Sequence, residues 1–419
     1  MAEHIIGITA DDLTGAADTA AALARPGSPV SVSLDAQPRA FEGRRAFAVT
    51  TGSRACPPEQ VYESVHGSVE ALRSAGATVI YKKVDSNLRG NVGTEVAAVV
   101  EATSGPVLFA PAFPARERTI IQGICLVCGT PVAETEMARD PEAPVTESDV
   151  LELLKSQREG LDVFTCPLSV VRAGRLAMRT SIPDHGVLLI DAETDDDLDA
   201  VAEVALSLDP IPALAGSAGF AGALARHLWG PAVSPRWPAE RFGPALAVLG
   251  SSSRVLATQV ETAAKVGFAT IPFPCQNLTR EDQPLPELET AIESAMTELA
   301  AGRDAIVYAA GALPSVERPI ELIVEHLAHL AYVVTRETRP NGLLVGGGST
   351  ALAVLETVGA EALEIDDEPL PGIAGGSVIG GHLAGIRVVL KPGAAGVETA
   401  VVQILGYLSH RRRMEAISR

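Results

Sequence analysis

The stretch "HIIGITADDLTGAADTAAAL", residues 4–23, has the order expected of a strand that runs directly into a helix. Its first residues are mostly apolar, Asp11 and Asp12 follow as adjacent carboxylates, and an alanine-rich segment begins after Gly15. A strand followed at once by a helix is the repeating unit of α/β folds. Because ligands of open α/β sheets bind outside the carboxyl ends of the strands, the two acids stand where such a fold places its binding groups.

The same alternation continues through all 419 residues, which are too many for one hydrophobic core. The proline-rich stretch "GPAVSPRWPAERFGP", 230–244, is the best linker candidate. We therefore predict an α/β fold of two domains, residues 1–235 and 244–419, each with a mostly parallel sheet flanked by helices. The predicted strands are 4–9, 29–34, 45–50, 77–83, 106–110, 161–166, 187–191 and 211–215 in the first half, and 245–249, 268–272, 304–309, 332–335, 342–345 and 386–390 in the second.

The composition of the chain argues against several classes of partner and site. A formal net charge of -19 argues against nucleic acid or an acidic membrane as partner. No apolar run reaches the roughly 18 residues of a membrane span, and no export signal is visible, so we expect a cytoplasmic protein. Cys125 and Cys128 form a C-x-x-C without a second pair, inside an apolar strand-like run. This predicts buried structural thiols rather than a zinc or redox site.

The strand ends of the first half carry polar and charged residues. Besides Asp11 and Asp12, they offer Thr51, Ser53, Arg54, Lys82, Lys83, Asp85, Ser86, Arg89, Asn91, Arg116 and Arg118. The cations between residues 82 and 118 are an unusual concentration in so acidic a chain, and they predict a site for a small carboxylate or phosphate. The alternative is that they are a set of ion pairs and solvated side chains.

Three predicted strands of the second half end in glycine- and serine-rich turns that open helices. The turns contain Gly250, Ser251, Ser252 and Ser253; Gly346, Gly347, Gly348, Ser349 and Thr350; and Lys391, Gly393 and Gly396. Such turns let a backbone approach closely and present unpaired N–H groups to an anion, as nucleotide phosphates require. Neither the P-loop pattern nor the dinucleotide-binding fingerprint is present. The alternative is that tight strand–helix turns simply need glycine.

A polar-ligand domain joined to a phosphate-binding domain favours a two-domain small-molecule kinase. Several stretches also carry a family resemblance. They are "GITADDLTGAADTA", "YKKVDSNLRGN", "FAPAFPARERT", "GTPVAETEMARDPEAPVTES", "GSAGFAGALA", "LGSSSRVLATQ", "NGLLVGGGSTALAVLE" and "PLPGIAGG…VVLKPGAAG". In this order they resemble the signature stretches of the four-carbon acid sugar kinase family, and the resemblance covers about residues 5–406.

The resemblance implies ATP-dependent phosphorylation of a hydroxyl of threonate, erythronate or a 3-oxo-tetronate. It implies a sugar-acid region formed by Asp11, Asp12, Arg54, Lys83, Asp85, Ser86, Arg89 and Asn91, and an ATP region formed by Ser251, Gly346, Gly347, Gly348, Ser349 and Gly393. The chain departs from the family pattern at Ser349, where an acid is usual, at the "KPGAAG" loop, and at Glu117, where glycine is usual.

Phosphoryl transfer needs a group that accepts or orients the proton of the attacking hydroxyl. We expect Asp12 to be that base and Asp11 to contact another substrate hydroxyl, although their order stays open. One of them is also a candidate for Mg²⁺ through water. Arg89 and Lys83 would clamp the substrate carboxylate. The alternative for Asp12 is an N-cap of the helix that starts near Gly15.

Other functions stay open at this point. They are a phosphotransferase for another small hydroxy acid, a nucleotide-dependent ligase, a sugar-acid sensor that has lost catalysis and, disfavoured by the missing fingerprint, an oxidoreductase. A symmetric dimer is the default expectation for such an enzyme.

Overall fold

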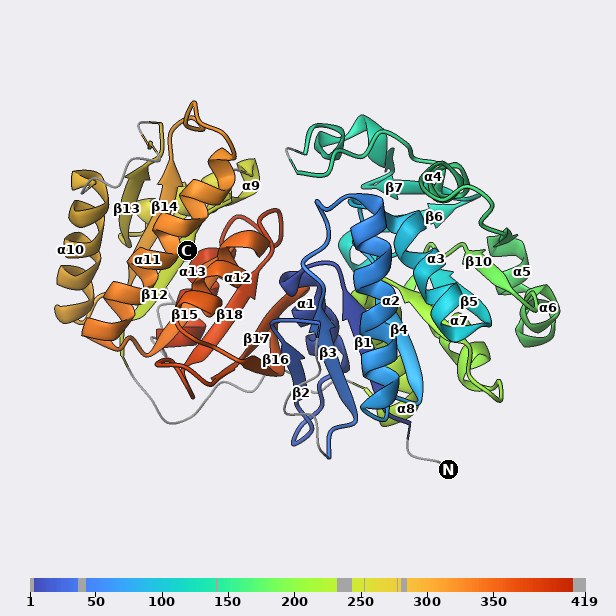
Figure 1. The fold of residues 1–419 in the computed structure, drawn as a ribbon. Helices are drawn as coiled ribbons and strands as arrows, with labels where there is room; N and C mark the ends of the chain where they lie inside the picture. The colour runs from blue at the N-terminus through green and yellow to red at the C-terminus, as the bar shows by residue number, and fades with distance from the viewer. Residues whose placement is uncertain are drawn as a thin grey trace. The chain divides into compact units, whose positions relative to one another are not determined.

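A computed structural model of the chain describes residues 4–36, 43–140, 142–231, 243–251, 253–276, 278–279 and 285–409. The chain divides into two compact units, Met1–Val233 and Ser234–Arg419 (Figure 1). Most of the proline-rich stretch 230–244 lies outside the described residues. No helix in the described part of the chain is long and apolar enough to cross a membrane.

The N-terminal unit is built on a parallel sheet with the strand order β2-β3-β1-β4-β11-β5-β10-β9. The strands are β1 (Ile6–Ala10), β2 (Val30–Ser33), β3 (Ala46–Thr50), β4 (Val79–Lys83), β5 (Pro106–Ala110), β9 (Val163–Cys166), β10 (Gly186–Ile190) and β11 (Ala213–Gly216). Those at the centre are buried on both faces, as parallel strands covered by helices must be.

Helices cover both faces of this sheet (Figure 1). On one face α2 (Pro58–Ser74) contacts α3 (Val92–Thr103), which contacts α4 (Val150–Gln157). On the other, α1 (Leu13–Leu23) contacts α8 (Ala218–Trp229), which contacts α7 (Asp195–Leu206). The short α5 (Leu168–Arg172) and α6 (Arg175–Ser181) pack beside α7. The helices cover the faces of the sheet, so that loops form the edge at the carboxyl ends of the strands. The polar residues lie in these loops.

A small antiparallel sheet follows β5. It contains β6 (Arg118–Ile121), β7 (Ile124–Val127) and β8 (Thr130–Pro131), and the short turns η1 (Pro114–Arg116), η2 (Val132–Glu134) and η3 (Glu136–Arg139) flank it. The sequence predicted two buried thiols here. Cys125 on β7 is buried, but Cys128 is exposed, because β7 ends at Val127 and Cys128 lies in the following turn with φ 50°. The prediction was therefore wrong for Cys128.

The C-terminal unit has the strand order β13-β14-β12-β15-β18-β17-β16. Its strands are β12 (Ala245–Leu249), β13 (Ala269–Pro274), β14 (Ala305–Ala310), β15 (Gly342–Gly346), β16 (Ala362–Leu370), β17 (Ile373–Ile379) and β18 (Arg387–Lys391). Pairing is parallel from β13 to β18 and antiparallel at β17 and β16. Both units thus confirm the predicted α/β class with mostly parallel sheets.

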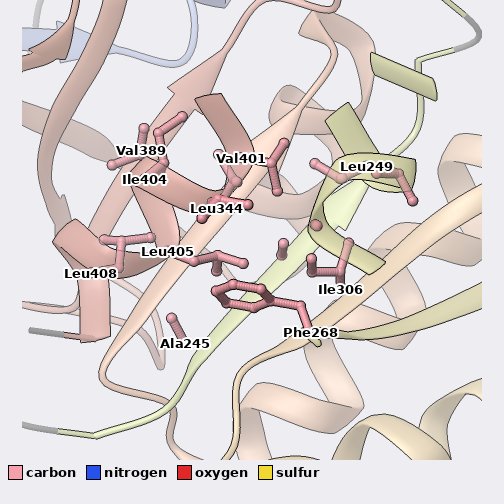
Figure 2. Close-up of a cluster of buried hydrophobic side chains, with 14 of the residues drawn as sticks. Ala245, Leu249, Phe268, Ile306, Leu344, Val389, Val401, Ile404, Leu405 and Leu408 are labelled. Carbon is pink, nitrogen blue, oxygen red and sulfur yellow. The ribbon is translucent and has the colours of Figure 1, made fainter. Parts of the chain in front are cut away.

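Helices also cover both faces of this second sheet (Figure 1). One face carries α9 (Arg254–Lys265) and α13 (Ala400–Ser409), and the other carries α10 (Pro286–Ala300), α11 (Pro319–Thr338) and α12 (Gly348–Thr357). Val401, Ile404, Leu405 and Leu408 recur at helical spacing on α13, and Figure 2 shows them beside Leu344 and Val389 of the sheet. This buried cluster packs α13 against the sheet.

One prediction for the C-terminal unit was wrong, and one pair of strands was not predicted. The predicted strand 332–335 is part of α11, because Leu327, Leu330, Ala331 and Val334 form one buried helical face. A short apolar run alone does not distinguish a strand from a buried helix. The antiparallel hairpin β16–β17 was not predicted, since its alternation is interrupted by register shifts and glycines.

Candidate functional site

Three neighbouring strands of the N-terminal unit end at the same level. In the parallel register, Ala10 of β1 pairs with Thr50 of β3 and with Lys83 of β4. The loops that follow therefore start side by side, and they carry Asp11 and Asp12, then Arg54, then Asp85. The sequence-predicted sugar-acid residues of these loops thus share one edge of the sheet.

Arg54 joins the two strand-end acids. Its Nε lies 2.6 Å from Asp11 Oδ2 and its Nη2 lies 3.0 Å from Asp11 Oδ1, which makes a bidentate ion pair. Its Nη1 donates to Asp12 Oδ2 at 2.7 Å. Burial raises the pKa of Asp11, but Arg54 and Lys82 more than reverse this, so the pKa lies below its ordinary value. Asp11 is therefore a buried anion whose two oxygens are bound by one guanidinium.

Asp12 caps helix α1, as the alternative interpretation predicted. Its Oδ1 accepts the backbone N–H of Gly15 at 2.7 Å, and its Oδ2 accepts the Thr14 hydroxyl at 2.8 Å as well as Arg54. Its side chain is 17% exposed, against 1% for Asp11. Of the two acids, Asp12 is therefore the more accessible.

Lys82 and Glu95 form a fully buried pair behind this edge. Lys82 Nζ lies 3.1 Å from Glu95 Oε2 and donates to the carbonyl of Lys83 at 2.8 Å. The second carboxyl oxygen of Glu95 has no partner among the described residues. Burial raises the pKa of Glu95 to about 7, although Lys82 acts in the opposite direction. Glu95 therefore gains or loses a proton near neutral pH.

The remaining cations of the edge also face acids. Lys83 Nζ lies 3.6 Å from Asp18 Oδ1 on α1, and burial raises the pKa of Asp18. Arg89 binds Asp85 at 2.7 Å through Nε and Asp140 at 3.1 Å through Nη1. Burial raises the pKa of Asp85, but Arg89 and Arg54 hold it below its usual range.

These ion pairs limit how freely the cations of the predicted anion site can bind a ligand. Lys82, Lys83 and Arg89 each lie beside a carboxylate, as the ion-pair alternative for the cation cluster predicted. A ligand carboxylate at this edge would share these cations with acids already present. Arg118 instead donates to the side chain of Asn87 at 3.2 Å.

Ser86 and Asn91 line the loop after β4 and shape it. The carbonyl of Ser86 accepts the Cys125 thiol at 3.8 Å, and the Asn91 amide donates to the carbonyl of Cys56 at 3.1 Å. Their side chains lie in the same loop as Asp85 and Arg89, so the structure brings the predicted sugar-acid residues into one neighbourhood.

In the C-terminal unit the three glycine turns converge. A Cβ on Gly393 would lie 2.2 Å from Ser251 Oγ, and a Cβ on Gly347 would lie 3.5 Å from the Ser251 backbone N. Gly347 has φ 108°, a conformation that favours glycine, and its N–H donates to the carbonyl of Lys391 at 3.0 Å. Ser251, Gly347 and Gly393 therefore meet in space although they are far apart in the sequence.

The turns are arranged around helix starts. Ser253 caps α9 by accepting the N–H of Leu256, and its hydroxyl also donates to the carbonyl of Gly393 at 2.9 Å. Gly347 is the N-cap of α12, so Gly348 and Ser349 form the first turn of that helix. Gly346, the last residue of β15, accepts the N–H of Gly250 at 2.9 Å. Such closely packed helix starts suit the binding of an anion.

Comparison with known proteins supplies the family. Residues 6–224 match the model of a sugar-binding N-terminal domain, and residues 246–401 match that of a nucleotide-binding C-terminal domain. A D-threonate kinase of Salmonella typhimurium is 30% identical over 96% of this chain and 97% of its own length. The chain belongs to the four-carbon acid sugar kinase family.

A second kinase and a solved structure also match almost the whole chain. A D-erythronate kinase of Heliobacterium modesticaldum is 29% identical over 96% of this chain and 96% of its own length. A solved protein of Salmonella typhimurium LT2 has a TM-score of 0.76 at 23% identity, covering 95% of this chain and 98% of that one. The last comparison confirms the fold alone.

One departure from the family pattern has a structural counterpart. Glu117 stands where glycine is usual and has φ 58°, the left-handed conformation that glycine adopts most readily. The structure therefore keeps the backbone shape with a non-glycine residue. The backbone N–H of Cys128 donates to the carbonyl of Glu117 at 2.8 Å, which ties this turn to the small sheet.

Reasoning from the sequence missed three acids that pair with the cations of this charged edge: Asp18, Glu95 and Asp140. Asp18 is the one acid of helix α1, and Glu95 lies in the first turn of the mostly apolar helix α3, and acids inside such helices were the available signal. Asp140 lies in the quoted stretch "GTPVAETEMARDPEAPVTES", but its contact with Arg89 could not be predicted from it, because that contact joins loops 51 residues apart. No group of three or more His, Cys, Asp or Glu within the described ranges is arranged to hold a metal ion.

Proposed function

We propose that this chain is an ATP-dependent kinase that phosphorylates a hydroxyl of a four-carbon sugar acid of the threonate, erythronate or 3-oxo-tetronate type. The observation that carries the proposal is the partly exposed carboxylate of Asp12, held at the strand edge by Arg54, in a chain that also has three convergent glycine turns. Membership of the four-carbon acid sugar kinase family supports the choice of acid.

The two units have separate roles in this proposal. Residues 1–235 bind the sugar acid, and residues 244–419 bind the nucleotide. The segregation of charged strand-end loops from glycine turns supports the division, as do the two domain models matched. Finding nucleotide bound to the 83–91 loop, with none at 346–349, would contradict it.

Asp12 is the proposed base. A carboxylate oxygen accepts two hydrogen bonds, and Oδ1 of Asp12 accepts one from Gly15 in the described structure. The remaining acceptor position can take the proton of the substrate hydroxyl as its oxygen attacks phosphorus. Arg54 orients the Asp12 carboxylate through Nη1. Asp11, whose oxygens both bind Arg54, acts through that guanidinium rather than by the substrate contact expected from the sequence.

The substrate carboxylate binds to Lys83 and Arg89 in this proposal, and Asp85, Ser86 and Asn91 shape the loop around it. Lys83 Nζ lies 3.6 Å from Asp18, longer than a charge-assisted hydrogen bond, so it can reorient toward a ligand carboxylate. Arg89 keeps its contact with Asp85 through Nε while Nη1 exchanges Asp140 for the ligand.

The phosphates bind to backbone N–H groups of the glycine turns. The proposed contacts come from Ser251, from Gly348 and Ser349 in the first turn of α12, and from Gly393. Gly346 and Gly347 shape the turn that lets the phosphates approach, since the N–H of Gly347 already donates to the carbonyl of Lys391. Mg²⁺ enters with ATP, because it is usually held by nucleotide phosphates and water with few protein carboxylates. It would neutralise phosphate charge during transfer.

The test is ATP consumption by the purified protein with D-threonate, D-erythronate and their 3-oxo analogue as separate acceptors. We expect one of them to give turnover well above the rate without acceptor. Nucleotide and acid binding without turnover for any acceptor would instead support a sensor, and turnover only with other hydroxy acids would reassign the substrate.

A further inference from the structure

Gln259 on helix α9 is completely buried and faces the last glycine-rich loop. Its Nε2 lies 3.1 Å from the carbonyl oxygen of Ala395, 3.0 Å from that of Gly396 and 2.9 Å from that of Val397. An amide nitrogen has two hydrogens, so three successive carbonyls share two donors. The side chain thus binds the backbone of the loop at three consecutive residues.

The orientation of this amide is determined by its surroundings. Exchanging the amide oxygen and nitrogen would place Oε1 at about 3 Å from three carbonyl oxygens, all of them acceptors. In the observed orientation Oε1 is buried and has no partner among the described residues. A buried polar atom without a partner costs free energy, so the contacts of Nε2 with the loop outweigh that cost.

The first part of the loop is held in the same way. Lys391 Nζ donates to the carbonyls of Pro392 and Gly393 at 3.1 Å each, and Ser253 Oγ donates to that of Gly393. Because the peptide unit is planar and trans, the N–H that follows each carbonyl points in the opposite direction. The carbonyls face α9 and Lys391, so the N–H groups of Gly393 and Ala394 face away from them.

We propose that Gln259 is a positioning residue for nucleotide binding: its amide holds residues 395–397 against α9 and so fixes the end of the loop whose Gly393 and Ala394 N–H groups are presented to phosphate. This rests on the proposed assignment of ATP to the C-terminal unit. Phosphate binds where consecutive N–H groups point to one side of a loop, and a loop free to rotate its peptides loses that arrangement.

The test measures ATP binding directly, by calorimetry on the full chain without sugar acid. In Gln259→Met the side chain keeps its length and loses its donors. Loss of hydrogen bonds worth about 1 kcal/mol each predicts a rise of roughly 10- to 100-fold in Kd for ATP. We expect the Kd for the sugar acid to stay the same. Thr335→Val, which removes a buried hydroxyl from α11, is the matched control and should bind ATP like the wild type.

A second variant separates positioning from stability. In Gln259→Glu the introduced carboxylate faces three carbonyls when ionised, but its protonated form can donate to one of them. The ratio of its Kd for ATP to that of the wild type should therefore fall as pH is lowered from about 8 to about 5.5. A merely structural role would lower the unfolding temperature without this recovery of affinity.

The outcomes separate the two proposals. Wild-type ATP affinity in Gln259→Met, or equal losses for ATP and the sugar acid, would overturn the role of Gln259 and leave the kinase assignment intact. Tight ATP binding by the wild type without turnover on any acid would overturn the kinase assignment, while a Gln259 effect on that binding would still support the positioning role.

Discussion

The two units present their candidate ligand groups in opposite ways. The N-terminal edge consists of charged side chains: Arg54 between Asp11 and Asp12, and Lys82 beside Glu95. The C-terminal turns consist of backbone, with Gly347 and Gly393 packed against Ser251. Both lie at the carboxyl ends of parallel strands, so the same architecture supports two different chemistries.

The difference follows from what each ligand needs. A sugar acid has hydroxyls that must be told apart and one that must lose a proton, which requires side chains with lone pairs and charges. Phosphates are large anions that several N–H groups can hold without any cation of the protein. The function of the charged edge is therefore expected to be sensitive to single charge changes and to pH. The function of the glycine turns is expected to be sensitive to added side-chain volume.

The largest effect expected on the charged side is that of Asp12→Asn. The amide oxygen can still accept the Gly15 N–H and cap α1, but the group no longer accepts a proton. Removal of a general base predicts a loss of about 10² to 10⁴ in kcat, with little change in KM for the acid. Steady-state kinetics measures both.

Thr14→Val is the control for Asp12→Asn. It removes one hydrogen bond to the same carboxylate and leaves its charge, so kcat should change by less than about tenfold. Turnover near the wild-type value in Asp12→Asn would exclude Asp12 as the base.

Asp11→Asn should act on stability more than on turnover. The amide nitrogen would face a donor of Arg54, and the buried guanidinium would keep Asp12 but lose the counter-charge of Asp11. Breaking a buried ion pair from one side typically costs about 3 to 5 kcal/mol. Urea unfolding followed by circular dichroism measures the loss. Glu203→Gln, in an exposed pair with Arg175, should leave the unfolding midpoint unchanged. A raised KM for the sugar acid with wild-type stability would instead support a direct contact between Asp11 and the substrate.

Glu95 gives the charged unit a pH dependence. Its pKa of about 7 in the folded chain lies above the ordinary value of 4.5, so the folded state binds the extra proton. Its contribution to stability is therefore present below about pH 4.5 and is lost as pH rises to about 7. Glu95→Gln cannot lose that proton. Relative to the wild type, it should gain stability on the order of 3 kcal/mol between about pH 5 and pH 8. A difference independent of pH would mean that Glu95 stays ionised beside Lys82.

The sequence predicted the strand ends well, because an apolar run followed by Asp11-Asp12 or by Gly346-Gly347 is a local pattern. It did not predict the partners of the charges, such as Asp18 for Lys83 or Asp140 for Arg89, since these contacts depend on tertiary packing. The apolar run 332–335 shows the same limit, because only the neighbouring buried face of α11 identifies it as helix.

The smallest effect is expected on the backbone side, from Gly250→Ala. A Cβ there would lie 2.1 Å from Thr350 Oγ1 and 3.1 Å from Leu327 Cδ1. The methyl group must therefore displace the first turn of α12, which carries the proposed phosphate contacts. Overpacking costs typically 1 to 3 kcal/mol, and part of it is expected to appear as a rise of about tenfold in Kd for ATP.

Thr350→Ala provides the matched rescue of Gly250→Ala. It removes the closest of the opposing atoms, so the double variant should recover most of the ATP affinity, a coupling that a double-mutant cycle measures by calorimetry. The Kd for the sugar acid should not change in any of the three variants, because the added volume lies in the C-terminal unit. A parallel loss of affinity for both ligands would show that the binding of ATP and the binding of the sugar acid are coupled. The contrast between a charged site and a backbone site would then fail, because a change in one would alter binding at the other.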